Sequence, residues 1–157
     1  MFFIEFQQVD GNVVATGSGS VNTAGLIRVG TDRAADFPLI VPQVANYGTG
    51  TPGQPITNFT RFSGLTGPSS FGPGGLKNAS TFSGGPLILL GRDGILDLPV
   101  DYISGATFSN SDTFNNATFS NLGLSVGTYT YTFGSGADAD SLVVRIGAAV
   151  PSLQRRQ

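Results

Sequence analysis

The amino-acid sequence predicts an all-β protein: a two-layer antiparallel β-sandwich, jelly-roll or immunoglobulin-like, with a long central loop region rich in glycine and proline. Three observations indicate this class. Hydrophobic and polar side chains alternate over several short segments, turn-forming residues separate these segments, and no segment of useful length shows the apolar period of a helix. We expect a single domain over residues 1–150, followed by a short basic tail over residues 151–157.

The chain opens with the pattern of a β-hairpin. Side chains in Phe2–Val9 alternate with a period of two, which is the period of a strand. Asp10-Gly11 follows, and both positions of this dipeptide tolerate the positive φ angles of a two-residue hairpin turn. The segment Asn12–Val21 is therefore expected to be the partner strand.

The stretch of residues 31–85 has a weaker pattern, since it carries many of the prolines and glycines. Proline removes a backbone donor and glycine adds backbone freedom, so continuous strands are not expected there. The pieces 37–41 and 58–62 are the candidates for short paired strands. Irregular stretches of this length inside a domain are often functional.

Regular patterns return in the C-terminal half. Residues 86–90 form a short apolar run typical of a buried strand, residues 102–108 favour a strand, and Ser109–Asp112 is expected to form a turn. The clearest strand lies near Tyr129, where aromatic side chains alternate with threonines. Tyr129 follows a turn and resembles a tyrosine corner, in which the phenol bonds to the backbone across that turn. An ordinary tyrosine at the start of a strand is the alternative.

Composition argues against several functional classes. The chain has no cysteine and no histidine, which removes disulfides, thiolate metal sites and imidazole-based catalysis. The eight basic residues are scattered and the net charge is −2, so the clustered cations of a nucleic-acid-binding protein are missing. No apolar run approaches the roughly 20 residues of a transmembrane helix. We therefore expect a non-enzymatic protein with no nucleic-acid partner and no transmembrane segment.

Three segments carry a family resemblance. They are the opening V-D-G-N-V-V-A-T-G-S-G-S within Phe6–Leu26, the L-P-V-D-Y-I-S-G-A-T-F of Leu98–Phe108, and the Leu-Gly-Leu, Gly-x-Tyr and Ala-Asp-Ser motifs within Phe119–Gly147. Together they resemble the bacterial exported proteins that carry a PEP-CTERM sorting signal. The signal peptide and the C-terminal anchor of that family do not appear in this sequence. The resemblance implies a protein of the cell surface or extracellular matrix, either released or retained by assembly, and implies no enzymatic activity.

Aromatic residues of the irregular middle are candidates for carbohydrate binding. Exposed aromatic faces stack on sugar rings while neighbouring polar side chains bond the hydroxyl groups. The candidates are Tyr47, Phe59, Phe62 and Phe71. The alternative is that these rings attach the long loop to the core.

Two carboxylates in a loop near the C-terminus are candidate metal ligands. Asp138 and Asp140 lie two residues apart among glycine, serine and alanine. Carboxylate and backbone oxygens are the ligands that calcium prefers, so calcium is the one cofactor that the sequence suggests. Solvated turn residues are the alternative reading, and paired carboxylates acting on a glycosidic bond are a further one.

These observations leave three hypotheses for function. The first is a structural or interaction protein of the bacterial extracellular matrix or biofilm, which associates with exopolysaccharide or with itself. The second is a lectin-like carbohydrate-binding module that uses the loop aromatics. The third is a filament subunit assembled by strand exchange, with Phe2–Val9 as the donor strand.

Overall fold

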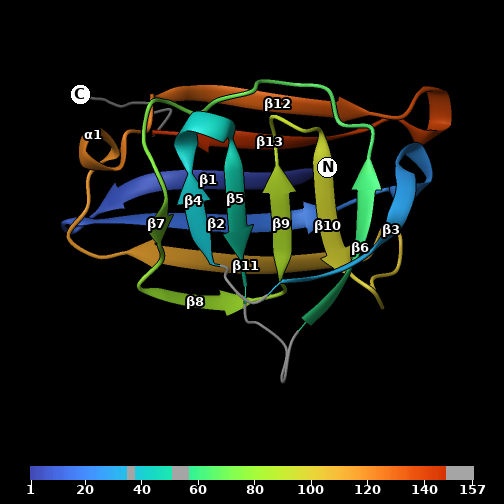
Figure 1. Cartoon of the computed structure of the whole chain (residues 1–157), viewed down its shortest axis with the longest axis horizontal. Coiled ribbons are helices and arrows are strands. Elements are labelled where there is room, and N and C mark those ends of the chain that lie inside the picture. Colours follow the sequence, from blue (N-terminus) through green and yellow to red (C-terminus); the bar gives the residue numbers. More distant parts are fainter. Residues whose placement is uncertain (35–37, 51–56, 148–157) are drawn as a thin grey trace, which may run out of the picture.

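The computed structural model describes residues 1–34, 38–50 and 57–147, and these are mostly β-strands arranged in two sheets (Figure 1). The predicted all-β sandwich is confirmed. The predicted basic tail over residues 151–157 lies outside the described residues.

The first sheet, sheet A, has six strands. In spatial order they are β12 (Gly127–Phe133), β13 (Asp140–Ile146), β1 (Phe2–Val9), β2 (Asn12–Ser20), β11 (Thr107–Phe114) and β8 (Thr81–Gly84). All neighbours are antiparallel except β1 and β13, which pair in parallel with Phe2 opposite Leu142. The first and last described strands thus lie side by side in sheet A, and because they are parallel the two ends of the described chain lie at opposite ends of this pair.

The second sheet, sheet B, has seven strands and is antiparallel throughout. In spatial order they are β3 (Ile27–Ala34), β6 (Thr57–Ser63), β10 (Ile95–Pro99), β9 (Leu87–Leu90), β5 (Asn46–Thr49), β4 (Leu39–Val41) and β7 (Lys77–Asn78). Four short helical turns complete the described chain: the α-helix α1 (Phe119–Leu122) and the 3-10 turns Thr23–Gly25, Pro42–Val44 and Gly136–Asp138. No helix among the described residues is both long and apolar enough to span a membrane.

The two sheets pack face to face with their strands crossed. In Figure 1 the central strands of sheet B run across those of sheet A rather than along them. Crossed packing of this kind brings side chains from many different strands into one interior layer. The candidate site described below lies between the sheet B connection from β6 to β7 and the sheet A connection from β11 to β12.

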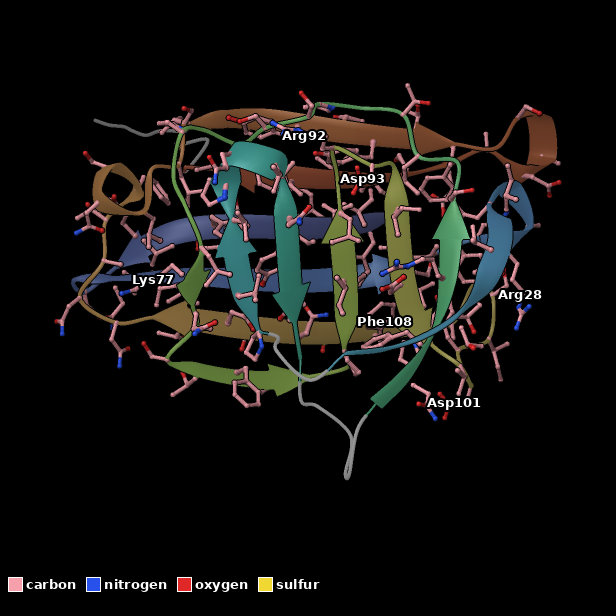
Figure 2. The ribbon with its side chains drawn as sticks, in the orientation of Figure 1. Arg28, Lys77, Arg92, Asp93, Asp101 and Phe108 are labelled. Atoms are coloured by element: carbon pink, nitrogen blue, oxygen red, sulfur yellow. The ribbon has the colours of Figure 1, made fainter. Side chains whose placement is uncertain are left out.

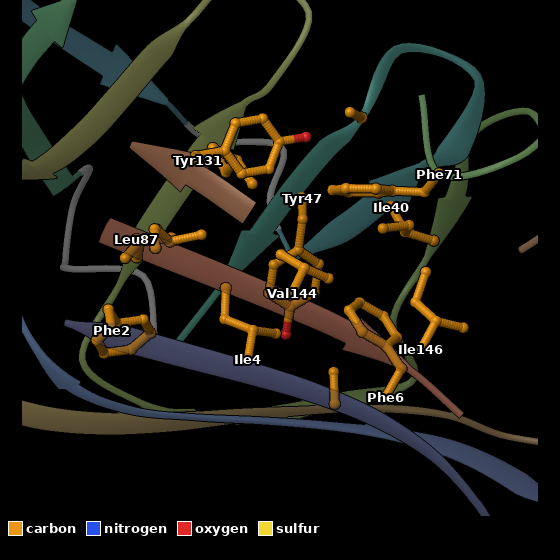
Figure 3. Close-up of a cluster of buried hydrophobic side chains, with 14 of the residues drawn as sticks. Phe2, Ile4, Phe6, Ile40, Tyr47, Phe71, Leu87, Tyr131, Val144 and Ile146 are labelled. Atoms are coloured by element: carbon orange, nitrogen blue, oxygen red, sulfur yellow. The ribbon is translucent and has the colours of Figure 1, made fainter. Parts of the chain in front are cut away.

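The interior is one cluster of apolar side chains drawn from both sheets (Figure 3). Alternate residues of β1, namely Phe2, Ile4 and Phe6, are fully buried, as the period of two predicts. The ring of Phe6 meets that of Tyr47 from sheet B edge-on, with 5.1 Å between ring centroids. This contact ties the two layers together near their centre.

The predicted N-terminal hairpin is present. Asp10 and Gly11 adopt φ angles of 52° and 83°, which a two-residue turn of this kind requires. The first strand of this hairpin, β1, is an interior strand of sheet A, because it pairs on one side with β2 and on the other with β13. Both edges of β1 are therefore paired within the chain, and the donor role of Phe2–Val9 stays a prediction.

Three local predictions are corrected by the structure. Of the predicted strand at residues 102–108, residues 102–106 lie outside any strand, and β11 begins only at Thr107. The central segment supplies β4 to β8, which is more strand than its proline and glycine content indicates, although the strands are mostly short. Ser109–Asp112 is the middle of β11 and not a turn. Asn110 and Asp112 are polar residues that point into the interior, and this placement inverts the usual pattern of a half-buried strand.

Candidate functional site

A cavity of about 490 Å³ lies between the loop 73–77 and the segment 115–123. Its polar side chains come from one lysine, three asparagines and one serine: Lys77, Asn115, Asn116, Ser120 and Asn121. We call this cavity the amide pocket. It contains no acidic and no aromatic side chain in its lining.

The turn after β11 places two of the amides. Asn116 has a φ of 52°, a left-handed conformation that asparagine tolerates better than most residues. The backbone N–H of Asn115 donates to Ser80 Oγ at 3.0 Å, and that of Asn116 donates to Asn12 Oδ1 at 3.0 Å. The backbone of the turn is thus fixed from two sides while both side chains are exposed to solvent.

The third amide belongs to a capping box on α1. The backbone N–H of Asn121 donates to Thr118 Oγ1 at 3.1 Å, and the backbone N–H of Thr118 donates to Asn121 Oδ1 at 2.9 Å. This reciprocal pair stabilises a helix of a single turn. Because the cap uses only Oδ1, the amide nitrogen of Asn121 keeps both of its donors for the pocket.

The two walls of the pocket meet through a pair of glycines. The backbone N–H of Gly74 donates to the carbonyl oxygen of Gly123 at 3.1 Å. A Cβ atom at Gly74 would overlap the carbonyl oxygen of Leu122, and one at Gly123 would overlap Gly74 itself. Gly123 also has a φ of 71°, the left-handed conformation that commonly ends a helix. Glycine is therefore needed at both positions for this close approach.

Phe71 and Tyr129 hold the loop wall in place. Phe71 is fully buried, and its ring packs edge-on against Tyr129 with 5.1 Å between centroids. The Tyr129 hydroxyl donates to the carbonyl oxygen of Ser125 at 2.6 Å, which is the backbone contact that the sequence predicts for this residue. In addition, the backbone N–H of Ser125 donates to the Phe71 carbonyl oxygen at 2.7 Å. The tyrosine thus supports the chain segments on both sides of the pocket.

The polar atoms of the amide pocket are available to a ligand. Within the part of the chain that the structure describes, the side chains of Lys77, Asn115 and Asn116 make no hydrogen bond and no ion pair. Beside them, the apolar side chain of Leu76 is 61% exposed. A pocket that combines exposed amides with an apolar contact suits a ligand with many hydroxyl groups.

Three of the four aromatic candidates for carbohydrate binding are in the core. Tyr47, Phe59 and Phe71 are fully buried, and Phe62 is partly buried against the apolar cluster. The prediction that these rings present faces to a sugar is therefore wrong for the first three. For Phe71 the structure shows the alternative reading: the ring attaches the loop to the core (Figure 3).

The two candidate calcium ligands have different environments. Both carboxylate oxygens of Asp140 accept backbone hydrogen bonds, from Asn22 at 2.8 Å and from Ser141 at 2.8 Å. The amino group of Met1 also lies 2.8 Å from Asp140 Oδ1. Asp138 is exposed in the turn Gly136–Asp138. Nowhere in residues 1–34, 38–50 and 57–147 do three or more Asp, Glu, His or Cys side chains come together. The contacts of Asp140 join the amino group of Met1 to the backbone of Asn22.

A second, smaller cavity of about 260 Å³ lies at the other end of β11. Its lining is more apolar and includes Tyr102, Phe108 and Pro86, with the carboxylate of Asp101 nearby (Figure 2). The hydroxyl of Tyr102 is already engaged, because it donates to the Ala106 carbonyl oxygen at 2.6 Å and accepts from the backbone N–H of Val21 at 3.0 Å. This cavity offers fewer free polar groups than the amide pocket.

Sequence reasoning missed the residues of the amide pocket. A usable signal was nevertheless present: Asn115-Asn116 directly follows a strand, and Thr118 and Asn121 have the spacing of a capping box. Lys77 is the only lysine of the chain, and it lies 38 positions or more from the asparagines in sequence. Only the fold brings Lys77 close to the asparagines of the amide pocket.

Comparison with known proteins adds no relative: no family model, no curated protein and no solved structure matches the chain.

Proposed function

We propose that this protein is a non-catalytic interaction protein of the bacterial cell surface or extracellular matrix, and that it holds polysaccharide in the amide pocket. The observation that carries the proposal is the set of exposed polar side chains in one cavity that have no partner within the described chain.

The chemistry of the pocket favours sugars over other ligand classes. Each amide both donates and accepts, which matches the hydroxyl groups of a sugar, and the exposed Leu76 offers an apolar contact for the C–H groups of a ring. A single lysine is too little charge for nucleic acid, and a pocket lined without carboxylates does not suit a metal ion. The resemblance to exported PEP-CTERM proteins supports a location where polysaccharide is abundant.

Co-sedimentation with insoluble polysaccharide tests the proposal. The double variant Asn115→Ala/Asn116→Gly removes two amides, and glycine at position 116 keeps the positive φ free of strain. We expect a loss of at least tenfold in the bound fraction at limiting polymer. Asn58→Ala is the matched control, because Asn58 is an exposed amide on β6 outside the pocket. Equal binding by the wild-type protein and both variants would overturn the proposal.

A second candidate function, assembly by strand pairing, is favoured by β3. This strand forms an edge of sheet B, and its side chains Ile27 and Val29 are 64% and 59% exposed. An edge strand with exposed apolar residues is a site where another chain can add a strand. Analytical ultracentrifugation would show concentration-dependent association that Val29→Lys abolishes. A protein that stays monomeric at high concentration contradicts this role.

A further inference from the structure

We propose that the amide pocket selects acidic sugars, with the Lys77 ammonium pairing with the carboxylate of a uronic-acid unit. This inference rests on the proposed polysaccharide-binding function and names the ligand class more narrowly. The juxtaposition that carries it is one cation among amides, in a cavity whose lining contains no carboxylate.

The position of Lys77 is set by the fold. Lys77 lies in β7, opposite Ile40 of β4, so its backbone is held in register with sheet B (Figure 2). Across the cavity, the turn after β11 carries Asn115 and Asn116. A sugar unit between these walls meets a positive charge on one side and amide groups on the other.

The charge of Lys77 is not neutralised within the described chain. Two other cations have partners: Arg145 pairs with Glu5 at 2.6 Å, and Arg92 donates to the carbonyl oxygen of Gln43 at 2.8 Å. Lys77 makes no ion pair with any described residue. The ammonium is therefore free to bind an anion without first breaking an internal contact.

Two physical arguments separate this site from general attraction of anions. The whole chain carries a net charge of −2, so its average field does not draw acidic polymers to the surface. A single exposed ion pair contributes only up to about 1 kcal/mol, so Lys77 alone would hold a free anion weakly. The remaining affinity must come from hydrogen bonds between the amides and the hydroxyl groups of the sugar. Inorganic phosphate has no such hydroxyl-bearing ring, so it should bind more weakly than a uronic acid.

The test compares two polymers with the same backbone. Titration calorimetry measures binding of the full chain to polygalacturonate and to its methyl ester, which keeps the hydroxyl groups but loses the charge. Inorganic phosphate serves as a competitor. We expect polygalacturonate to bind ten times more tightly per sugar unit than its methyl ester. The affinity for polygalacturonate should fall as the salt concentration rises, and inorganic phosphate should compete little.

Variants assign the effect to the residue. Lys77→Gln should remove the preference for the acid, so that the variant binds the acid and the methyl ester alike. Arg28→Gln is the matched control, because Arg28 is an exposed cation without a described ion pair and lies on β3, outside the pocket. The Arg28→Gln variant should keep the preference for polygalacturonate over its methyl ester.

Each other outcome overturns a defined part of the account. Equal binding of acid and ester would end the acidic-sugar inference while the proposed function stands. Binding of neither polymer would remove the inference, and the co-sedimentation experiment would then decide the proposed function separately. If phosphate displaced the polymer at a concentration similar to that of the uronic-acid units, the pocket would be a general anion site. This result would contradict the selection of acidic sugars.

Discussion

The Thr49 hydroxyl donates a 2.7 Å hydrogen bond to Asp112 Oδ1, and this bond joins the two sheets inside the core. Both residues are fully buried. Three neighbouring or facing polar atoms, Asp112 Oδ2, Asn110 Oδ1 and Tyr47 Oη, have no hydrogen-bond partner of normal geometry in the structure. Burial raises the pKa of Asp112 to about 7, although its bonds to Thr49 and to the backbone of Gly50 oppose the shift.

The first prediction is that stability falls as pH rises toward neutrality because of Asp112. Its pKa is higher in the folded protein than in the unfolded chain, so the folded state holds the proton more tightly. The contribution to stability is complete below about pH 4 and is lost as pH rises through the folded pKa. A shift from 3.8 to about 7 corresponds to a loss on the order of 4 kcal/mol.

Urea unfolding at several pH values, compared between wild type and Asp112→Asn, measures this effect. Asparagine has nearly the same shape and does not titrate, so the difference between the two proteins isolates this carboxyl group. We expect the variant to become progressively more stable than wild type between pH 4 and pH 8. Parallel pH profiles for the two proteins would show that Asp112 does not titrate in this range.

The second prediction concerns the two tyrosines that bond to backbone four residues away. Tyr129→Phe removes the bond to Ser125, and Tyr102→Phe removes the bond to Ala106, each 2.6 Å long. We expect Tyr129→Phe to lower the free energy of unfolding by about 1 kcal/mol. Tyr102→Phe should lower it by more, because the backbone N–H of buried Val21 also loses its acceptor. Only Tyr129→Phe should weaken polysaccharide binding, because only this tyrosine supports the amide pocket.

Thermal unfolding and co-sedimentation of both variants check this prediction. The Tyr102 variant controls for a loss of stability as such, since it loses a bond of the same kind at a distance from the pocket. If both variants lost binding equally, the supporting role assigned to Tyr129 would be wrong.

The third prediction is that the contact between the pocket walls does not tolerate a methyl group. In Gly74→Ala the new Cβ would overlap the carbonyl oxygen of Leu122, so the loop must move away from α1. We expect a loss of about 1–3 kcal/mol of stability, as for other overpacked sites, and weaker polysaccharide binding. Gly75→Ala is the control, because a Cβ there has nothing within 4 Å.

Chemical denaturation and binding of the two alanine variants provide the measurement. The Gly75 variant should match wild type in stability. Gly30→Ala, on β3 outside the pocket and also with nothing within 4 Å of its Cβ, should match wild type in both assays. If the Gly74 variant were as stable as wild type and bound polysaccharide equally well, the two walls of the pocket would not be in the close contact described.

The fold class was predictable because alternation is a local property. The interior pattern of β1 and the turn at Asp10-Gly11 follow directly from the order of residue types. Sheet order was not predictable, since the parallel pairing of β1 with β13 joins residues about 140 positions apart. Strands of three or four residues, such as β4 and β5, are too short to show a period.

The site was less predictable than the fold. Ser109–Asp112 contains only turn-forming residue types, and its place in a strand follows from pairing with β2 on one side and β8 on the other. The sequence predicts that aromatic residues of the middle segment stack on sugar rings, because no local sequence pattern shows that a ring such as that of Tyr47 is buried. Tyr129 was the exception, because a tyrosine corner forms within five residues of chain.

The most direct test of the account is a nuclear magnetic resonance titration of the ¹⁵N-labelled protein with soluble oligogalacturonate. Side-chain amide signals of asparagine are resolved separately from the backbone, so Asn115, Asn116 and Asn121 report on the amide pocket themselves. The account predicts that the shifted signals cluster in residues 73–77 and 115–123. Shifts confined to the cavity at Tyr102 and Phe108, or to the edge strand β3, would contradict the assignment of the binding site.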